Sequence, residues 1–384
     1  MKKLIAIFAV STLMVGTAFA QAQVSGLVEG RLYVVDAIFD DNDTNDQIRG
    51  DIGAAYIQLA GQNPDGTLGG LFRLRNTDIV RTAQWFHRVF VWWRPVEQFR
   101  MFLGIDNDGL FDTASIVGWD FHEGDNDYLF NHHWDFWREV FPGNWDGFGI
   151  AFSFWPVEGL NLNLTVPVGG MNWPQSTASQ VRLGRNLADV WKGLRLQGSY
   201  AISDVGIIQF AYNLGDKDGT GDKHYAFDDS HFGRLGVSFL LNSIDSINIL
   251  VGGSVLFLDS ADGINPRIHI GAGFTWAGDG LGVKFRTAVR LQGDNDQFLN
   301  ANVMPYFKLG PGTLMVDFGI STQLASDTNN FGWYTTPMYR MPVSSGTVAV
   351  GFQLFSNITM EGNINLTGNT DVRLRIPVLL RFGF

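Results

Sequence analysis

Apolar and polar side chains alternate with a period of two along most of this chain. In residues 160–166 leucine alternates with asparagine and threonine, and in residues 281–291 mostly apolar residues alternate with glycine, alanine, lysine and arginine. Residues 372–384 repeat the pattern with arginine on the polar side. A period of two is typical of β-strands that have one apolar and one polar face. The chain is therefore predicted to be all-β.

Soluble β-sandwiches and transmembrane β-barrels both show this alternation. A sandwich packs its apolar faces against each other, whereas a transmembrane barrel turns them to lipid and keeps a polar lumen. The alternating segments of about 9–13 residues are longer than the usual soluble strand. Aromatic residues recur at the ends of the apolar faces, where they would meet the two membrane boundaries. They are Trp93, Phe99, Phe154, Tyr200 and Trp276 at one end, and Phe148, Tyr212 and Phe257 at the other.

Short and long connections also take turns, which favours a barrel with short periplasmic turns and longer outer loops. Tight turns are expected at residues 64–66, 95–97, 157–159, 203–204, 242–243, 278–280, 311–312 and 356–357. Long connections are expected at 38–50, 77–85, 106–147, 168–193, 215–230, 259–266, 293–300 and 323–345. The pattern predicts an antiparallel up-and-down transmembrane barrel of about 18 strands, with 16 as the alternative. Residues 323–345 could contain an extra hairpin. The connection at residues 367–370 is shorter than the long outer loop expected at its position.

The first residues have the pattern of an export signal. Lys2 and Lys3 precede an apolar stretch, and Ala20 or Ala22 ends it with small residues suited to cleavage. Residues 1–20 are thus predicted to be a cleaved signal peptide and residues 21–384 the barrel. Beyond it, no apolar run approaches the length of a membrane helix.

Composition excludes several functional classes. The net charge of −11 argues against a nucleic-acid partner, because phosphate binding requires a basic surface. The absence of cysteine excludes disulfides, thiolate catalysis and a lipoprotein anchor. None of the seven histidines is followed two positions later by serine, so a nucleophile–base pair on one strand face is missing. The sequence predicts no enzyme activity, no cofactor and no metal site.

Together with the signal peptide and the alternation, the final strand, which ends Arg381-Phe382-Gly383-Phe384, resembles that of bacterial outer-membrane porins. The resemblance implies an exported barrel in the outer membrane of a Gram-negative-type bacterium, surrounded by outer-membrane lipids. It also implies that the barrel-assembly machinery reads the C-terminal strand, with Phe382 and Phe384 as the signal. Porins often form trimers, so a homotrimer is a further expectation.

Residues 106–147 form the longest expected connection and follow the fifth strand. In general porins the loop at this place folds into the lumen and narrows it, so the resemblance implies that this loop is the pore constriction. Its acidic residues include Asp106, Asp108, Asp112, Asp120, Glu123, Asp125 and Asp127. A solvated outer loop is the alternative, although its many aromatic rings favour packing on the barrel wall.

A basic wall is expected opposite that loop. Arginine in the middle of a lipid-facing surface costs about 2–4 kcal/mol, so the strand arginines are predicted to point inward. They are Arg73, Arg75, Arg88, Arg94, Arg100, Arg286 and Arg290, with Arg195, Arg234, Lys284, Arg373 and Arg375 on the same parity. Such charges tune ion preference.

The sequence thus predicts a porin that forms a water-filled channel for passive diffusion of small hydrophilic solutes and ions. Two alternatives stay open. Inward-facing rings could form a lane for sugars (Tyr33, Phe90, Trp92, Phe102 and Tyr306). Alternatively, the barrel could be plugged and act as an adhesin or a structural surface protein.

Overall fold

The computed structural model describes ten segments of the chain. They are residues 23–39, 44–76, 88–106, 147–169, 194–214, 231–260, 263–292, 296–324, 331–357 and 372–383. Strands and the turns between them make up these segments. Within them, no helix is long and apolar enough to cross a membrane.

The strands follow one another as a single antiparallel sheet. Their bounds are β1 Gln23–Phe39, β2 Thr44–Gln62, β3 Leu68–Asn76, β4 Arg88–Val96, β5 Phe99–Asp106, β6 Gly147–Phe154, β7 Leu160–Gly169, β8 Arg195–Ile202, β9 Gly206–Leu214, β10 His231–Ile244, β11 Ile247–Ser260, β12 Gly263–Ala277, β13 Leu281–Gln292, β14 Asp296–Leu309, β15 Gly312–Gln323, β16 Phe331–Val343, β17 Gly346–Gly351, β18 Gln353–Ser356 and β19 Val372–Gly383.

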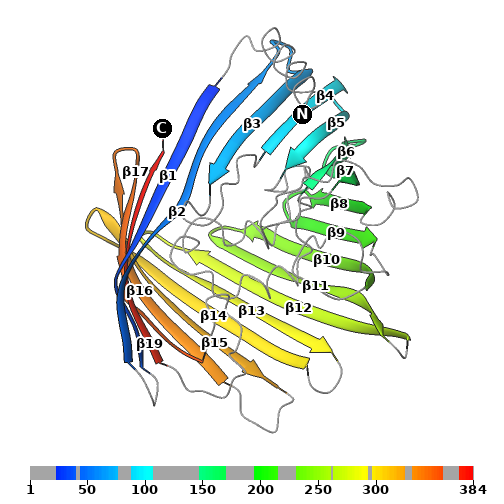
Figure 1. Ribbon diagram of the computed structural model, residues 1–384. Coiled ribbons are helices and arrows are strands. Elements are labelled where there is room, and N and C mark those ends of the chain that lie inside the picture. Colours follow the sequence, from blue (N-terminus) through cyan, green and yellow to red (C-terminus); the bar gives the residue numbers. More distant parts are fainter. Residues whose placement is uncertain are drawn as a thin grey trace.

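The sheet closes on itself. β1 pairs with β2 on one side and with β19 on the other, where the register runs from Leu27 opposite Gly383 to Phe39 opposite Val372. Figure 1 shows the first and last strands side by side. Closure pairs the strand edges, as a sheet in lipid requires.

β17 and β18 together occupy one barrel position. Both pair with β16 and with β19 in an unbroken register, so the barrel has 18 strands. The interruption has a simple cause: the register places Pro337 of β16 opposite Phe352, and Pro377 of β19 opposite Gly351. Proline has no N–H to donate to the ladder, although Phe352 N still donates to Pro337 O at 2.9 Å. The predicted all-β, antiparallel barrel of about 18 strands is confirmed.

Two strand assignments near the C-terminus were wrong. Residues 323–345 were expected to be a loop, but they contain β16, which joins β17 through a turn at Ser344 and Ser345. The prolines and threonines of β16 break the apolar alternation, which concealed a strand. The tight turn expected at 356–357 cannot lead into a strand that pairs with β18, because β18 already pairs with β16 on one side and with β19 on the other. The strand expected at 358–366 lies outside the described residues.

Other corrections concern strand ends. Strands extend into the loops expected at 38–50, 259–266 and 293–300, and the turn expected at 242–243 lies at Asp245 and Ser246. These strand ends are rich in Asp, Asn and Gly. A strand that projects beyond the lipid has water on both faces, so its polar residues do not mark where pairing stops.

The two faces of the barrel differ in polarity. Side chains with high exposure alternate with buried ones, and the exposed set is apolar: Val237 is 49% exposed, Trp93 47% and Val251 46%. The buried set contains many polar side chains, such as Asn163 at 1% and Gln197 at 2%. The apolar set therefore faces outward and the polar set faces the lumen, as predicted.

Aromatic side chains lie on the outer face near strand ends. Trp93, Phe154, Tyr200 and Tyr212 are all exposed. Phe99 packs beside Phe154 across β5 and β6, with ring centroids 5.1 Å apart. Such rings fit the two boundaries between lipid and water.

Candidate pore lining

The arginines that were predicted to form a basic wall lie on strands at positions of inward parity. Arg73 on β3, Arg88 and Arg94 on β4, Arg100 on β5, and Arg286 and Arg290 on β13 alternate with outward apolar neighbours. Arg75 follows on β3 with the same parity, but its side chain lies outside the described residues. The additional inward cations predicted on β8, β10, β13 and β19 are also on this face, with Arg195 2% and Arg375 1% exposed.

The inner wall also contains charged residues that sequence reasoning missed. Arg267 on β12 and Arg340 on β16 share the inward parity. Asp317 on β15 is 3% exposed and is the one strand carboxylate among the side chains that the structure describes. The sequence did contain a signal for Asp317, because it is a charged residue at an inward-facing position of an alternating strand. The described wall is thus strongly cationic, although the whole chain is acidic.

A hydrogen-bond chain crosses four neighbouring strands, β13 to β16, on this inner face. Arg286 Nε donates to Asn302 Oδ1 at 3.0 Å, and Asn302 Nδ2 donates to Asp317 Oδ1 at 3.0 Å. Tyr334 OH also donates to Asp317 Oδ1, at 3.2 Å. Asp317 therefore accepts at least these two hydrogen bonds, as a buried carboxylate requires. The chain fixes the inward side chains of these strands relative to one another.

Aromatic rings orient several wall arginines. The Arg290 guanidinium lies 4.5 Å from the Phe298 ring centroid, and that of Arg375 lies 5.5 Å from the Phe355 centroid. Arg73 donates to Gln58 Oε1 at 2.8 Å through Nε and lies 4.6 Å from the Tyr56 ring centroid. Cation–π contacts hold the charge without neutralising it. These arginines are therefore positioned along the wall while their charge is kept.

The inward rings of β4 and β5 pack on one another. Phe90 and Phe102 meet edge to face at 5.9 Å, and Phe90 lies 6.3 Å from Trp92. Leu71 and Ala151 complete this cluster, in which Phe90 is 5% and Phe102 4% exposed. Rings buried in this way do not offer open faces on which a sugar could stack. Tyr33, another ring of the expected sugar lane, has no described side chain.

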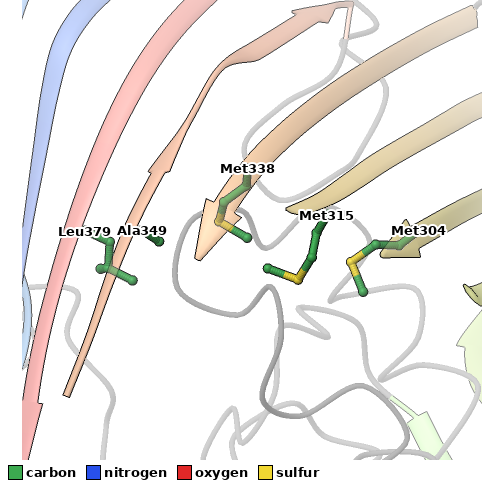
Figure 2. Close-up of a cluster of buried hydrophobic side chains, with 5 residues drawn as sticks. All are labelled: Met304, Met315, Met338, Ala349 and Leu379. Atoms are coloured by element: carbon green, nitrogen blue, oxygen red, sulfur yellow. The ribbon is translucent and has the colours of Figure 1, made fainter. Parts of the chain in front are cut away.

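An apolar patch lies on the inner face of β14 to β19. Figure 2 shows its members, Met304, Met315, Met338, Ala349 and Leu379, one from each of five strands. Tyr306, the last ring of the expected lane, packs against this patch. Methionine fills irregular gaps well, and here it replaces the polar side chains that line the wall elsewhere. The patch makes this stretch of the lumen apolar near the short-turn end of the barrel.

Most of the expected constriction loop lies outside the described residues. Asp106 ends β5 and its backbone pairs with Gly147 of β6, so both ends of the loop are anchored in the wall. Its other predicted acidic residues, Asp108, Asp112, Asp120, Glu123, Asp125 and Asp127, are not described. Phe384 and the expected signal peptide also lie outside, whereas Phe382 is 43% exposed on the outer face of β19.

The side chains that the structure describes include no group of three or more His, Asp or Glu residues that could hold a metal ion. His269 is the one histidine with a described side chain, and it is 1% exposed on the inner face of β12. The other six histidines lack described side chains.

Solved structures with the same architecture include several porins. The chain matches a BenF-like porin from Pseudomonas fluorescens Pf-5 with a TM-score of 0.59 and 10% identity, covering 95% of this chain and 100% of that one. It matches OccK1 (OpdK) of Pseudomonas aeruginosa with a TM-score of 0.57 and 11% identity, covering 96% of this chain and 100% of that one. It matches the anion-selective porin of Comamonas acidovorans with a TM-score of 0.52 and 10% identity, covering 95% of this chain and 99% of that one. No family model and no curated protein sequence matches the chain. At these identities the likeness concerns the fold.

Proposed function

We propose that this chain, which has the fold of bacterial outer-membrane porins, is a water-filled channel of the outer membrane that admits small hydrophilic solutes by passive diffusion. The observation that carries the proposal is the distribution of polarity over the closed sheet. Apolar side chains form the outer face and polar or charged side chains form the inner face. A soluble protein would bury the first set and expose the second.

The outer membrane is the setting that this surface fits. A broad apolar outer face is stable in contact with lipid and would aggregate in water. The exposed rings near strand ends would lie at the boundaries of the lipid, and the short turns would face the periplasm. The outward-facing Phe382 leaves the C-terminal strand accessible to an assembly factor, which supports recognition by the barrel-assembly machinery with Phe384. A homotrimer remains a proposal that rests on the resemblance alone.

Anions are the solutes that the described wall favours. Its strands carry Arg73, Arg88, Arg94, Arg100, Arg195, Arg234, Arg267, Lys284, Arg286, Arg290, Arg340, Arg373, Arg375 and Arg381 on the inward parity, with Asp317 as the carboxylate among described strand side chains. Charge on a pore wall selects mobile ions of the opposite sign. One structural neighbour is named an anion-selective porin, which is consistent with this preference.

The acidic loop between β5 and β6 would oppose this preference, and we retain it as the proposed constriction. Changing Asp120, Glu123, Asp125 and Asp127 together to Asn or Gln should make the channel more anion-preferring, because four negative charges would leave the narrowest part of the pore. The reversal potential in a planar bilayer under a salt gradient measures this change. An unchanged reversal potential in correctly folded protein would remove these residues from the constriction.

The solved neighbours are porins rather than enzymes, and a channel requires no catalytic residues. The sugar-lane alternative is not favoured, because the rings of β4 and β5 bury one another. A conductance measurement distinguishes the plugged-barrel alternative from a channel, because a plugged barrel passes no current.

A further inference from the structure

Two arginines face each other at the short-turn end of the barrel. Trp93 of β4 pairs with Met101 of β5, and Arg94 and Arg100 are the next residues toward the turn, both on the inward parity. There the register shifts before the turn. Like charges placed opposite each other in neighbouring strands destabilise a sheet. A sequence that keeps two such charges together needs a group that compensates them.

The ring of Trp155, just after β6, lies close to both guanidinium groups. The Arg94 guanidinium lies 5.9 Å from the Trp155 ring centroid and the Arg100 guanidinium lies 5.4 Å from it. Trp155 is held there by its backbone, since its N–H donates to Gln98 O at 2.8 Å. Arg100 also lies 5.5 Å from the Phe102 ring centroid. The rings orient both cations, but they supply no negative charge.

Within the described part of the chain, neither guanidinium is paired with a carboxylate. Arg94 donates through Nη2 to the backbone carbonyl of Glu97 at 3.0 Å, although the carboxylate of that residue is close in sequence. The Nε atoms of Arg94 and Arg100 are both buried without a hydrogen-bond acceptor. Buried guanidinium nitrogens that lack acceptors are costly.

We propose that Arg94, Arg100 and Trp155 form a binding site for a doubly charged tetrahedral oxyanion, of which inorganic phosphate is the simplest example. Each guanidinium presents a planar fork that matches two oxygens of such an anion. A dianion compensates both charges at once, whereas chloride or a single carboxylate leaves one of them. The site deepens the anion preference proposed above and rests on it for its role in transport, but not for binding itself.

Phosphate binding to the whole, detergent-folded protein tests the site. Isothermal titration calorimetry at constant ionic strength should show one saturable site that binds phosphate at least tenfold more tightly than acetate. Arg94→Gln and Arg100→Gln should each weaken phosphate binding tenfold or more, as expected for the loss of charge-assisted hydrogen bonds. Arg94→Lys should give an intermediate loss, because it keeps the charge and removes the fork. Lys308→Gln, which removes a cation from the exposed end of β14, is the control and should leave binding unchanged.

Thermal unfolding gives a second readout with opposite signs. Without phosphate, Arg100→Gln should raise the melting temperature, because it relieves the repulsion from Arg94. Added phosphate should raise the melting temperature of the native protein by mass action and leave that of the double Gln variant unchanged. Absent binding, binding that survives both Gln substitutions, or acetate binding as tight as phosphate would overturn the site. Binding by a protein without conductance would instead refute the channel and leave the site standing.

Discussion

Replacing Val237 by arginine should lower the free energy of unfolding of the barrel by about 2–4 kcal/mol, the cost of a cation at a lipid-facing position near the membrane centre. Val237 lies in the middle of β10 and is 49% exposed on the outer face. The same strand already carries Arg234, which is 6% exposed on the inner face. The strand thus accepts arginine on one face, and we expect the other face to reject it.

Equilibrium unfolding by guanidinium chloride in phospholipid vesicles measures this difference. Val237→Leu is the matched control, because it keeps the outer face apolar, and it should change stability by less than the arginine variant. An arginine variant as stable as the native protein would show that this face is not in contact with lipid. The assignment of the two faces would then have to be reversed or abandoned.

Reversing two wall charges on β13 should weaken the anion preference of the pore. Arg286 and Arg290 lie on the inner face near the middle of the barrel wall, and Arg286 is held there by Asn302. Arg286→Glu combined with Arg290→Glu converts two positive charges to negative ones beside Asp317. The pore should then favour anions less strongly, because fixed charge in a narrow lumen sets the local ion concentrations.

The reversal potential under a salt gradient should therefore shift toward cation preference in the double variant. Lys308→Glu makes the same change of charge per residue at the exposed end of β14 and should shift the potential little. Heat-modifiable gel mobility confirms that each variant is folded. If the double variant kept the native reversal potential, β13 would not line the path of the ions.

The repeating features of the barrel could be predicted from sequence because each is local. Alternation in residues 281–291 alone assigns both faces of β13, and the lipid penalty then places Arg286 and Arg290 inside. The same reasoning correctly placed the exposed rings Trp93 and Tyr200 on the outer face. Closure followed from the number of strands and from the need to pair every edge.

Features that depend on interruptions or on distant partners could not be predicted. β16 was missed because Pro337 breaks its alternation, and its place in the sheet depends on pairing with β15 and β17. The buried hydrogen bond from Asn302 to Asp317 could be predicted only if the register between β14 and β15 were known. Arg94 and Arg100 both lie close to Trp155, which follows β6. This arrangement depends on the register shift between β4 and β5, which the sequence does not reveal.

Ionic conductance of the purified, folded protein in a planar lipid bilayer tests the central claim most directly. A water-filled barrel with a polar inner wall should insert and produce large current steps that rise linearly with voltage. Under a salt gradient the current should reverse at a potential that indicates anion preference. Protein that shows heat-modifiable mobility and inserts into the bilayer, yet passes no current, would contradict a channel.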